Sequence, residues 1–329
     1  MLRWHIESKE LHLRYTWKIS RNSSDVKTNL FIRVADQQYV GIGEAAPNIR
    51  YGETAIALAN QFSSLIDNGL ELVRSLEDLQ MLLSLHGVAN ALRFAVESAY
   101  IHYHCQRHHK SVSEFLGVAL PVAVPTVFTL PIMEPDLIPD FIRDNNLNRF
   151  QTLKVKVNQE NALDLIREVS KNSNCPLIID GNEAWEEPDN LLQVQEQLEA
   201  LPIVMIEQPM PANKVEEYIY LKQNSRYDLF ADESVTNYAD FDLIQKQFHG
   251  VNMKLMKAGG YLNGKHILDQ ARQHQLKTMI GCMVETSLGI WSAMQLCQGI
   301  GFADLDGFLI LKDELFGIVQ EREGKLFAR

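Results

Sequence analysis

Three acidic residues recur at nearly equal intervals, each at the end of a short apolar run. They are Asp180 in LIIDGNEAW, Glu207 in VMIEQP and Asp232 in FADES, separated by 27 and 25 residues. Each interval fits one strand and one helix, so we expect the carboxylates on the ends of successive parallel strands, converging on one point. Ligation by oxygen alone suits one Mg²⁺ ion. The alternative is three helix N-caps, a position that favours Asp, but three acids in register favour the metal.

Lysines accompany these acids on two other predicted strands. Alternation in TLKVKV places Lys154 and Lys156 on one strand face, opposite the apolar residues that face the helices. An exposed edge strand would also carry such charges, but a closed barrel has no exposed edge. A third lysine, Lys257, follows a later strand in NMKLMKAGG, and Lys254 lies within that strand. We therefore expect these lysines at the barrel axis.

The strands of Lys156 and Lys257 are the second and sixth of eight, which lie on opposite sides of a barrel. The two amines can approach a bound substrate from opposite faces, with the metal between them. This arrangement suits removal of a proton from one face of a carbon and its return on the other. A lysine base must be neutral, so its pKa must fall well below the usual ~10.4 through burial and cationic neighbours such as Lys154.

The prediction of a barrel rests on the regular alternation of predicted strands and helices after Val122. Eight short β-rich runs alternate there with seven amphipathic helical stretches, which predicts a parallel sheet. The runs are Thr126–Leu130, Thr152–Val157, Leu177–Asp180, Val204–Glu207, Leu229–Asp232, Asn252–Leu255, Thr278–Cys282 and Ala303–Asp306. Eight units of this length fit a closed barrel, so we expect an α/β fold, a modified TIM barrel of (β/α)7β type, in residues 121–307.

The first 120 residues have a different pattern, in which predicted strands are followed by helices. Thr28–Val34 and Tyr39–Ile42 predict a β-hairpin, and helical periodicity follows at about 54–70, 72–85 and 89–109. This predicts an α+β capping domain in residues 1–120, with the tail, residues 308–329, packing back on it.

The motifs carry a resemblance to a known family. KVK, DGN, IEQP, ADES and KLMKAGG, in this order, resemble the muconate-lactonizing subgroup of the enolase superfamily, and GIGEAAP at 41–47 is similar to the Gly-Glu signature of its capping domain. Sites of this superfamily pair a Lys or His base with a divalent metal. The resemblance implies that Asp180, Glu207 and Asp232 bind the metal and that Lys156 and Lys257 are the two acid/base lysines. It further implies that Lys154 contacts the enolate oxygens. The implied supporting residues are Asn182, Lys254 and Glu285.

The last strand, FADLDGF, distinguishes the members of the subgroup. It places Asp304 and Asp306 on one face. In dipeptide epimerases a matching Asp-x-Asp pair holds the free α-ammonium of the substrate, so the resemblance implies a dipeptide epimerase, for Ala-Glu or a related dipeptide. Without a cation the two carboxylates would repel one another. The alternatives are an N-acylamino acid racemase or an o-succinylbenzoate synthase on the same scaffold, or a solvated pair that caps the last turn.

Two other regions contribute to the expected pocket. The seventh strand, GCMVETS, gives the lining residues Cys282, Met283 and Val284, with Glu285 supporting a neighbouring lysine. Cys282 as a nucleophile is disfavoured, because no strand-end motif supplies a suitable His. The capping loops, residues 18–24 and 48–52, carry Arg21 and Arg50, which either bind a side-chain carboxylate of the substrate or are exposed to solvent.

Other features exclude or disfavour further functions. The HYHCQRHHK segment at 102–110 has spacings that suit zinc, but a polar helix end far in sequence from the barrel acids is the simpler interpretation. The strand-end motifs hold no His of the kind that sugar-acid dehydratases use, and a non-catalytic barrel would not need both lysines. The net charge of −11 disfavours nucleic acid and anionic membranes as partners.

The cell compartment follows from the same composition. The four cysteines form no CxxC pair, and neither a signal peptide nor a membrane span is evident. We therefore expect a cytoplasmic enzyme that acts on a small molecule. The sequence leaves open whether it forms a homo-oligomer.

Overall fold

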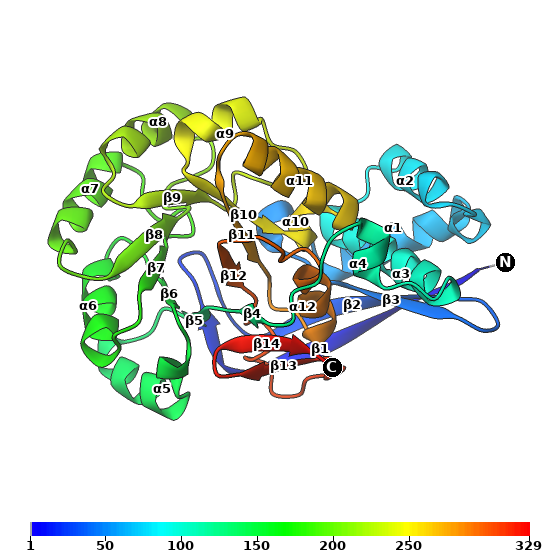
Figure 1. The fold of residues 1–329 in the computed structure, drawn as a ribbon, viewed down its shortest axis with the longest axis horizontal. Helices are drawn as coiled ribbons and strands as arrows, with labels where there is room; N and C mark the ends of the chain where they lie inside the picture. Colours follow the sequence, from blue (N-terminus) through cyan, green and yellow to red (C-terminus); the bar gives the residue numbers. More distant parts are fainter. Residues whose placement is uncertain (1) are drawn as a thin grey trace.

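Eight parallel strands form a nearly closed barrel in the computed structural model, which describes residues 2–329. Each strand pairs with its neighbours in the chain, in the order β5 to β12 (Figure 1). The two ends of the sheet meet through hydrogen bonds from Val127 N–H to Ala303 O, 2.9 Å, and from Leu305 N–H to Thr126 Oγ1, 3.0 Å. The barrel strands are β5 (Phe128–Leu130), β6 (Leu153–Lys156), β7 (Leu177–Asp180), β8 (Ile203–Glu207), β9 (Asp228–Ala231), β10 (Gly250–Lys254), β11 (Lys277–Gly281) and β12 (Phe302–Asp304). The predicted barrel fold is confirmed.

Helices cover the outside of the barrel, as Figure 1 shows. They are α5 (Ile138–Asp144), α6 (Ala162–Asn172), α7 (Pro188–Gln197), α8 (Val215–Asn224), α9 (Phe241–Gln247), α10 (Leu255–Ala258), α11 (Tyr261–Gln273) and α12 (Ser287–Met294). In α6 the apolar residues Leu165, Ile166 and Val169 recur at helical spacing and are fully buried, so this face packs on the strands. A separate small core fills the barrel interior with Val127, Ile178, Met205, Phe230 and Met279. Across residues 2–329, every helix is too short or too polar to cross a membrane.

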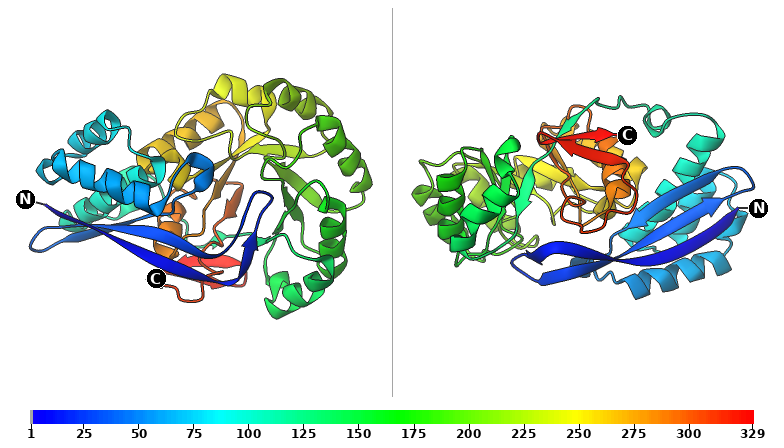
Figure 2. Two further views of the ribbon diagram at one scale, coloured as in Figure 1. Left: turned by 180° about the vertical axis from the view of Figure 1, so that it is seen from behind. Right: turned by 90° about the horizontal axis from the view of Figure 1, so that it is seen from below.

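The N-terminal unit is a three-stranded antiparallel sheet with helices on it. Its elements are β1 (Arg3–Lys18), β2 (Ser23–Ala35), β3 (Val40–Ala45), α1 (Ala55–Asp67), α2 (Leu76–Leu85), α3 (Asn90–Arg107) and α4 (Val112–Leu116). The predicted hairpin is formed by β2 and β3, with Ala35 opposite Val40. β1 was not predicted, because only Trp4, Leu11 and Leu13 of its sixteen residues are buried. The β1–β2 hairpin reaches from this unit to the barrel (Figure 2).

The GIGEAAP motif joins the two parts of the molecule. Glu44 of β3 is buried and accepts hydrogen bonds from Thr286 N–H (2.9 Å) and Gly289 N–H (3.0 Å) at the N-terminus of α12, and from the Asn29 amide (2.8 Å). A carboxylate at a helix N-terminus satisfies otherwise unpaired N–H groups and interacts well with the helix dipole. This acid therefore fixes the capping sheet to the last barrel helix.

The tail contacts both the barrel and β1. Its strands β13 (Val319–Arg322) and β14 (Lys325–Ala328) pair with each other, and β14 pairs with β4 (Val124–Pro125), just before the barrel. Before these strands in the chain, Leu311 forms an isolated antiparallel β-bridge with Leu13 of β1. The carbonyl oxygen of Leu311 also accepts a hydrogen bond from the Arg14 side chain at 2.8 Å.

β3 packs so closely on α3 that position 43 has no room for a side chain. A Cβ atom there would overlap the carbonyl oxygen of Ala95 and the hydroxyl of Ser98. We expect Gly43→Ala to destabilise the protein by about 2–3 kcal/mol, because overpacking against backbone cannot relax. The urea midpoint, followed by circular dichroism, measures the effect. Gly301→Ala is the control, since its Cβ would lie 3.3 Å from the nearest atom, Thr278 O. Equal midpoints for the two variants would contradict the prediction.

Candidate active site

The predicted acids do lie together at the C-terminal ends of the strands. Asp180 and Glu207 end β7 and β8 and stand opposite each other in the register, while Asp232 follows the last residue of β9. All three side chains are buried. On β6, Lys156 stands opposite Asp180, so lysines and acids share one level of the barrel.

Lys154 is the centre of this charge cluster. Its ammonium lies 3.0 Å from Asp180 Oδ2, 2.9 Å from Glu207 Oε2 and 2.8 Å from Asp304 Oδ2. Burial favours the neutral amine, but these carboxylates hold the pKa of Lys154 well above its usual value. Lys154 is therefore a fixed cation that joins β7, β8 and β12.

Glu207 is buried between one neutral and one cationic partner. Its Oε1 accepts a hydrogen bond from the Asn252 amide at 2.9 Å, whereas its Oε2 accepts no hydrogen bond within residues 2–329 but forms an ion pair with the Lys154 ammonium, 2.9 Å away. Burial raises the pKa of Glu207 to about 7; Lys154 opposes this shift, and the negative charges of Asp180 and Asp232 add to it. Further positive charge close to Glu207 would favour its ionised form.

The three acids fit a divalent ion by their chemistry. They offer only oxygen donors, they repel one another, and the pKa of Glu207 stays raised although Lys154 lies beside it, which suits Mg²⁺. In the described chain, however, no three acidic, His or Cys side chains already surround a common point in metal-binding geometry. Lysine ammonium groups stand between the carboxylates instead. An ion would thus compete with these lysines for the same oxygens.

Lys156 is held by two groups at the end of β7. Its ammonium donates to Asp180 Oδ2 at 2.7 Å and to Asn182 Oδ1 at 2.9 Å, and it lies 6.0 Å from the centre of the Trp17 ring. The backbone N–H of Asn182 donates to Asp180 Oδ1 at 3.0 Å. Asn182 therefore contacts both the expected base and an expected metal ligand, as a supporting residue would.

Lys257 lies across the barrel, on the short helix α10 that follows β10. Its ammonium is 2.6 Å from Asp232 Oδ1, while Lys254 is 2.9 Å from Asp232 Oδ2. Burial lowers the pKa of Lys257, Asp232 opposes this effect, and the charge of Lys254 adds to it. Burial also lowers the pKa of Lys254, but the charges of Asp232, Glu207 and Asp304 together outweigh it, so this pKa is raised. Of these two lysines, Lys257 is the better suited to act as a base.

The Asp304 and Asp306 pair differs in part from expectation. Both are buried at the end of β12, but Asp304 already contacts a cation, Lys154, and accepts a hydrogen bond from Thr129 Oγ1 at 3.1 Å. Asp306 accepts a 2.6 Å hydrogen bond from the Thr129 N–H. Burial and the charge of Asp304 raise the pKa of Asp306 to about 7. The acid that can gain from a new cation is therefore Asp306.

The capping loops cover the barrel mouth through ion pairs. Arg21 contacts Glu183 Oε2 at 2.7 Å and Glu233 Oε1 at 2.6 Å, and Arg50, in the 3-10 helix η1 (Ile49–Tyr51), also contacts Glu183 at 2.7 Å. Each arginine was expected either to bind a substrate carboxylate or to be exposed. Both residues are exposed, and each guanidinium also has a carboxylate partner from the barrel loops, which fastens the cap to the barrel.

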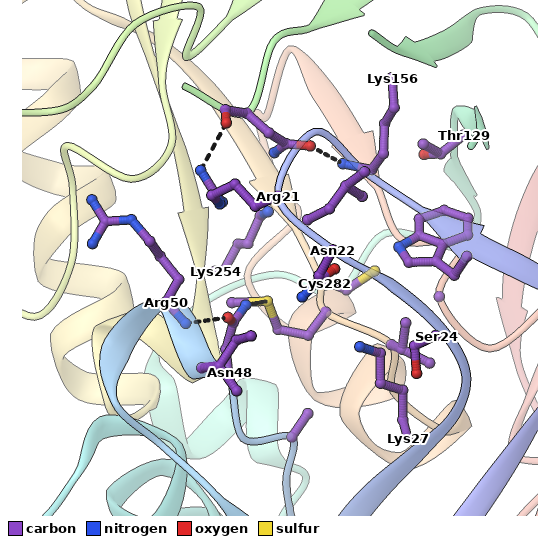
Figure 3. Close-up of a pocket in the computed structure, with 18 of the residues that line it drawn as sticks. Arg21, Asn22, Ser24, Lys27, Asn48, Arg50, Thr129, Lys156, Lys254 and Cys282 are labelled. Atoms are coloured by element: carbon purple, nitrogen blue, oxygen red, sulfur yellow. Dashed lines mark hydrogen bonds between the residues drawn. The ribbon is translucent and has the colours of Figure 1, made fainter. Parts of the chain in front are cut away.

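A cavity of 520 Å³ lies between the loops and the barrel. Figure 3 shows lining residues from both parts, including Arg21 and Arg50 from the cap and Lys156 and Lys254 from the barrel. Residues that the sequence analysis missed also line it: Trp17, Lys27, Tyr51, Thr129 and Glu233. Two of these carried a sequence signal: Glu233 lies within ADES, and Tyr51 lies within the capping loop 48–52.

The seventh-strand loop lines the cavity, as expected. Cys282, Met283 and Val284 are partly exposed in it, and burial and Glu285 raise the pKa of the Cys282 thiol, which disfavours a thiolate. The expected lysine contact of Glu285 is not formed anywhere in residues 2–329. Glu285 accepts a hydrogen bond from the Met283 N–H at 2.7 Å instead, so it shapes the loop.

One residue of the His-rich segment, His102, contacts both the cap and the barrel. His102 on α3 is half-buried, with Nδ1 2.6 Å from Ile42 O and Nε2 2.9 Å from the Tyr261 hydroxyl. Burial lowers the pKa of His102 to about 4, so the ring is neutral. Cys105 donates to Ser111 O, and the His104 and His108 rings pack against each other.

Comparisons with known proteins agree with this geometry. Residues 140–314 match the family model described as enolase C-terminal domain-like. The L-Ala-D/L-amino acid epimerase of Pedosphaera parvula is 30% identical, over 97% of this chain and 94% of that protein. The L-Ala-D/L-Glu epimerase of Bacteroides thetaiotaomicron is 28% identical, over 96% of this chain and 83% of that protein.

A solved structure extends the likeness to the whole fold. The dipeptide epimerase of Methylococcus capsulatus, complexed with Mg and the dipeptide L-Arg-D-Lys, has a TM-score of 0.89 to this chain and 25% identity. The match covers 99% of this chain and 96% of that one. The family match spans more than half of the sequence, and the full-length relatives extend it over almost all of the rest. The chain belongs to the enolase C-terminal domain-like family.

Proposed function

We propose that this protein is a Mg²⁺-dependent dipeptide epimerase that inverts the α-carbon of the C-terminal residue. The observation that carries this proposal is the placement of Lys156 and Lys257 on opposite walls of the barrel, with three buried acids between them. Relatives named as L-Ala-D/L-Glu and L-Ala-D/L-amino acid epimerases support it, as do the Mg and dipeptide in the Methylococcus structure. In this proposal residues 1–120 form the cap and 121–307 the catalytic barrel.

Proton transfer is assigned to the two lysines. The neutral amine of one lysine takes the α-proton from its face of the substrate, and the ammonium of the other returns a proton to the opposite face. A divalent ion held by Asp180, Glu207 and Asp232 would supply positive charge that offsets the charge developing on the substrate carboxylate. Lys154, a permanent cation beside these acids, adds to that stabilisation.

Binding of the free amino end is assigned to Asp306. This acid is buried, has a raised pKa and contacts no lysine ammonium among the described residues, so a substrate ammonium next to it would favour its ionised form. N-acylated amino acids lack that charge. The proposal therefore favours a free dipeptide over the substrate of an N-acylamino acid racemase.

The metal assignment predicts a loss of Mg²⁺ binding. Asp180→Asn, Glu207→Gln and Asp232→Asn each remove one charged oxygen, and each should weaken Mg²⁺ binding by at least about 100-fold, since even the partners of metal ligands contribute 10–100-fold. Isothermal titration calorimetry measures this directly. Asp228→Asn, at the other end of β9 and paired with Lys277, is the control. Unchanged Mg²⁺ affinity in all three variants would refute the site.

The two-base assignment predicts stereospecific residual exchange. Lys156→Ala and Lys257→Ala should each lower epimerisation by at least about 100-fold, because each removes one acid/base. Each variant should still exchange the α-proton of one stereoisomer in D₂O, detected by mass spectrometry. Lys277→Ala, outside the cavity on β11, serves as the control. Near-normal epimerisation by either variant would exclude the assignment.

The role of Asp306 predicts a selective defect. Asp306→Asn should lower kcat/KM for free dipeptides by about two to three decades, because loss of one partner of a desolvated ion pair costs ~3–5 kcal/mol. Turnover of N-acetylated dipeptides should change little. Asp313→Asn, exposed in the tail, is the control. Equal wild-type activity on free and N-acetylated substrates would instead favour an N-acylamino acid racemase.

A further inference from the structure

The proposed chemistry determines where the substrate side chain must point, and this inference rests on the proposed function. Removal of the α-proton makes the α-carbon planar, with its carboxylate, nitrogen and side chain in one plane. Lys156 and Lys257 face the two sides of that plane from β6 and from α10, which follows β10. The carboxylate then points to the acids of β7–β9 and the nitrogen to β12. The side chain is left with the one open direction, along the barrel axis towards the cap.

The cap offers three cations in the cavity, and only one of them lacks a partner among residues 2–329. Arg21 and Arg50 are both paired with carboxylates at 2.7 Å or less. The barrel lysines of the cavity are also paired, with Asp180, Glu207, Asp232 or Asp304. Lys27 forms neither an ion pair nor a side-chain hydrogen bond with any residue from 2 to 329, although the chain as a whole carries an excess of acids.

The side chain of Lys27 lines the cavity and does not lie on the open surface of the protein. It lies on β2 opposite Leu11 of β1, and it shares a strand face with Asn29, whose amide donates to Val284 O at 2.9 Å. That face is therefore directed at the lining loop of the cavity. The side chain is half-buried, and Figure 3 shows its amine end directed into the cavity beside Ser24. Burial lowers the pKa of Lys27, which reflects the missing counter-charge.

We propose that Lys27 binds a carboxylate on the side chain of the substrate's C-terminal residue, so that the enzyme prefers dipeptides with an acidic residue there. A half-buried amine without a counter-ion gains more from an incoming anion than an arginine that already has carboxylate partners. The opposite end of the substrate meets Asp306, so the cavity presents an unpaired cation and an unpaired acid to a ligand that carries both charges.

The test compares two nearly isosteric substrates, L-Ala-L-Glu and L-Ala-L-Gln, by deuterium uptake at the α-carbon in D₂O with Mg²⁺. The wild type should prefer L-Ala-L-Glu by about 10- to 100-fold in kcat/KM, the range expected of a hydrogen bond to a charged group. Lys27→Met should remove that preference by slowing L-Ala-L-Glu alone, with L-Ala-L-Gln changed less than about threefold. Lys27→Arg should retain the preference.

Controls separate this inference from a folding defect and from the proposed function. Turnover of L-Ala-L-Gln by Lys27→Met reports correct folding, and Lys18→Met, an exposed lysine next to the cavity residue Trp17, should keep the wild-type ratio. Two results for Lys27→Met would overturn the inference: an equal loss of activity on both substrates, or an unchanged ratio of kcat/KM for L-Ala-L-Glu to that for L-Ala-L-Gln. A preference for L-Glu-L-Ala over L-Gln-L-Ala that depends on Lys27 would also overturn it. Each of these results would leave the epimerase assignment intact. Absence of exchange with every dipeptide would overturn both.

Discussion

The buried ammonium of Lys154 is the contact on which the barrel mouth depends. It neutralises carboxylates from β7, β8 and β12 at distances of 3.0 Å or less, deep in a region from which water is excluded. Acids brought this close would otherwise repel one another and remain protonated. Even with Lys154 present, the pKa of Glu207 stays raised, so the cluster accepts further positive charge. One residue thus keeps the acids together and leaves them able to attract a metal ion.

The cap is attached to the barrel by contacts of two kinds. Glu44 is buried and His102 is half-buried, and breaking their hydrogen bonds would leave polar groups unsatisfied away from bulk water. At the mouth, the side chains of Arg21 and Arg50 are 31% and 37% exposed, but their partners Glu183 and Glu233 are only 7% and 2% exposed. Separating the loops from the barrel would leave these carboxylates without their partners, so the ion pairs also hold the cap in place.

The features that the sequence predicted are those that follow from local periodicity. Eight β-rich runs at regular spacing predict a barrel, and the position of an acid at the end of such a run predicts its level in the barrel, so Asp180, Glu207 and Asp232 do lie at strand ends. Pairing between distant segments has no such signal. The contact of Arg21 with Glu183 spans 162 residues, and the contact of Lys154 with Asp304 spans 150. Strand β1 escaped prediction for a related reason, because its inward residues are few and its pairing with β2 is set by the hairpin.

Lys154, Lys257 and Lys27 differ in the number of carboxylates that contact their ammonium groups, and this number agrees with the role proposed for each. Lys154 touches three carboxylates and remains charged, which excludes it as a base. Lys257 touches one, shares it with Lys254, and has a lowered pKa, as a proton acceptor requires. Lys27 touches none within the described part of the chain and lines the cavity that the substrate would enter. The proposed roles of these three amines, as a structural cation, an acid/base and a binding group, thus follow the number of carboxylates within reach of each.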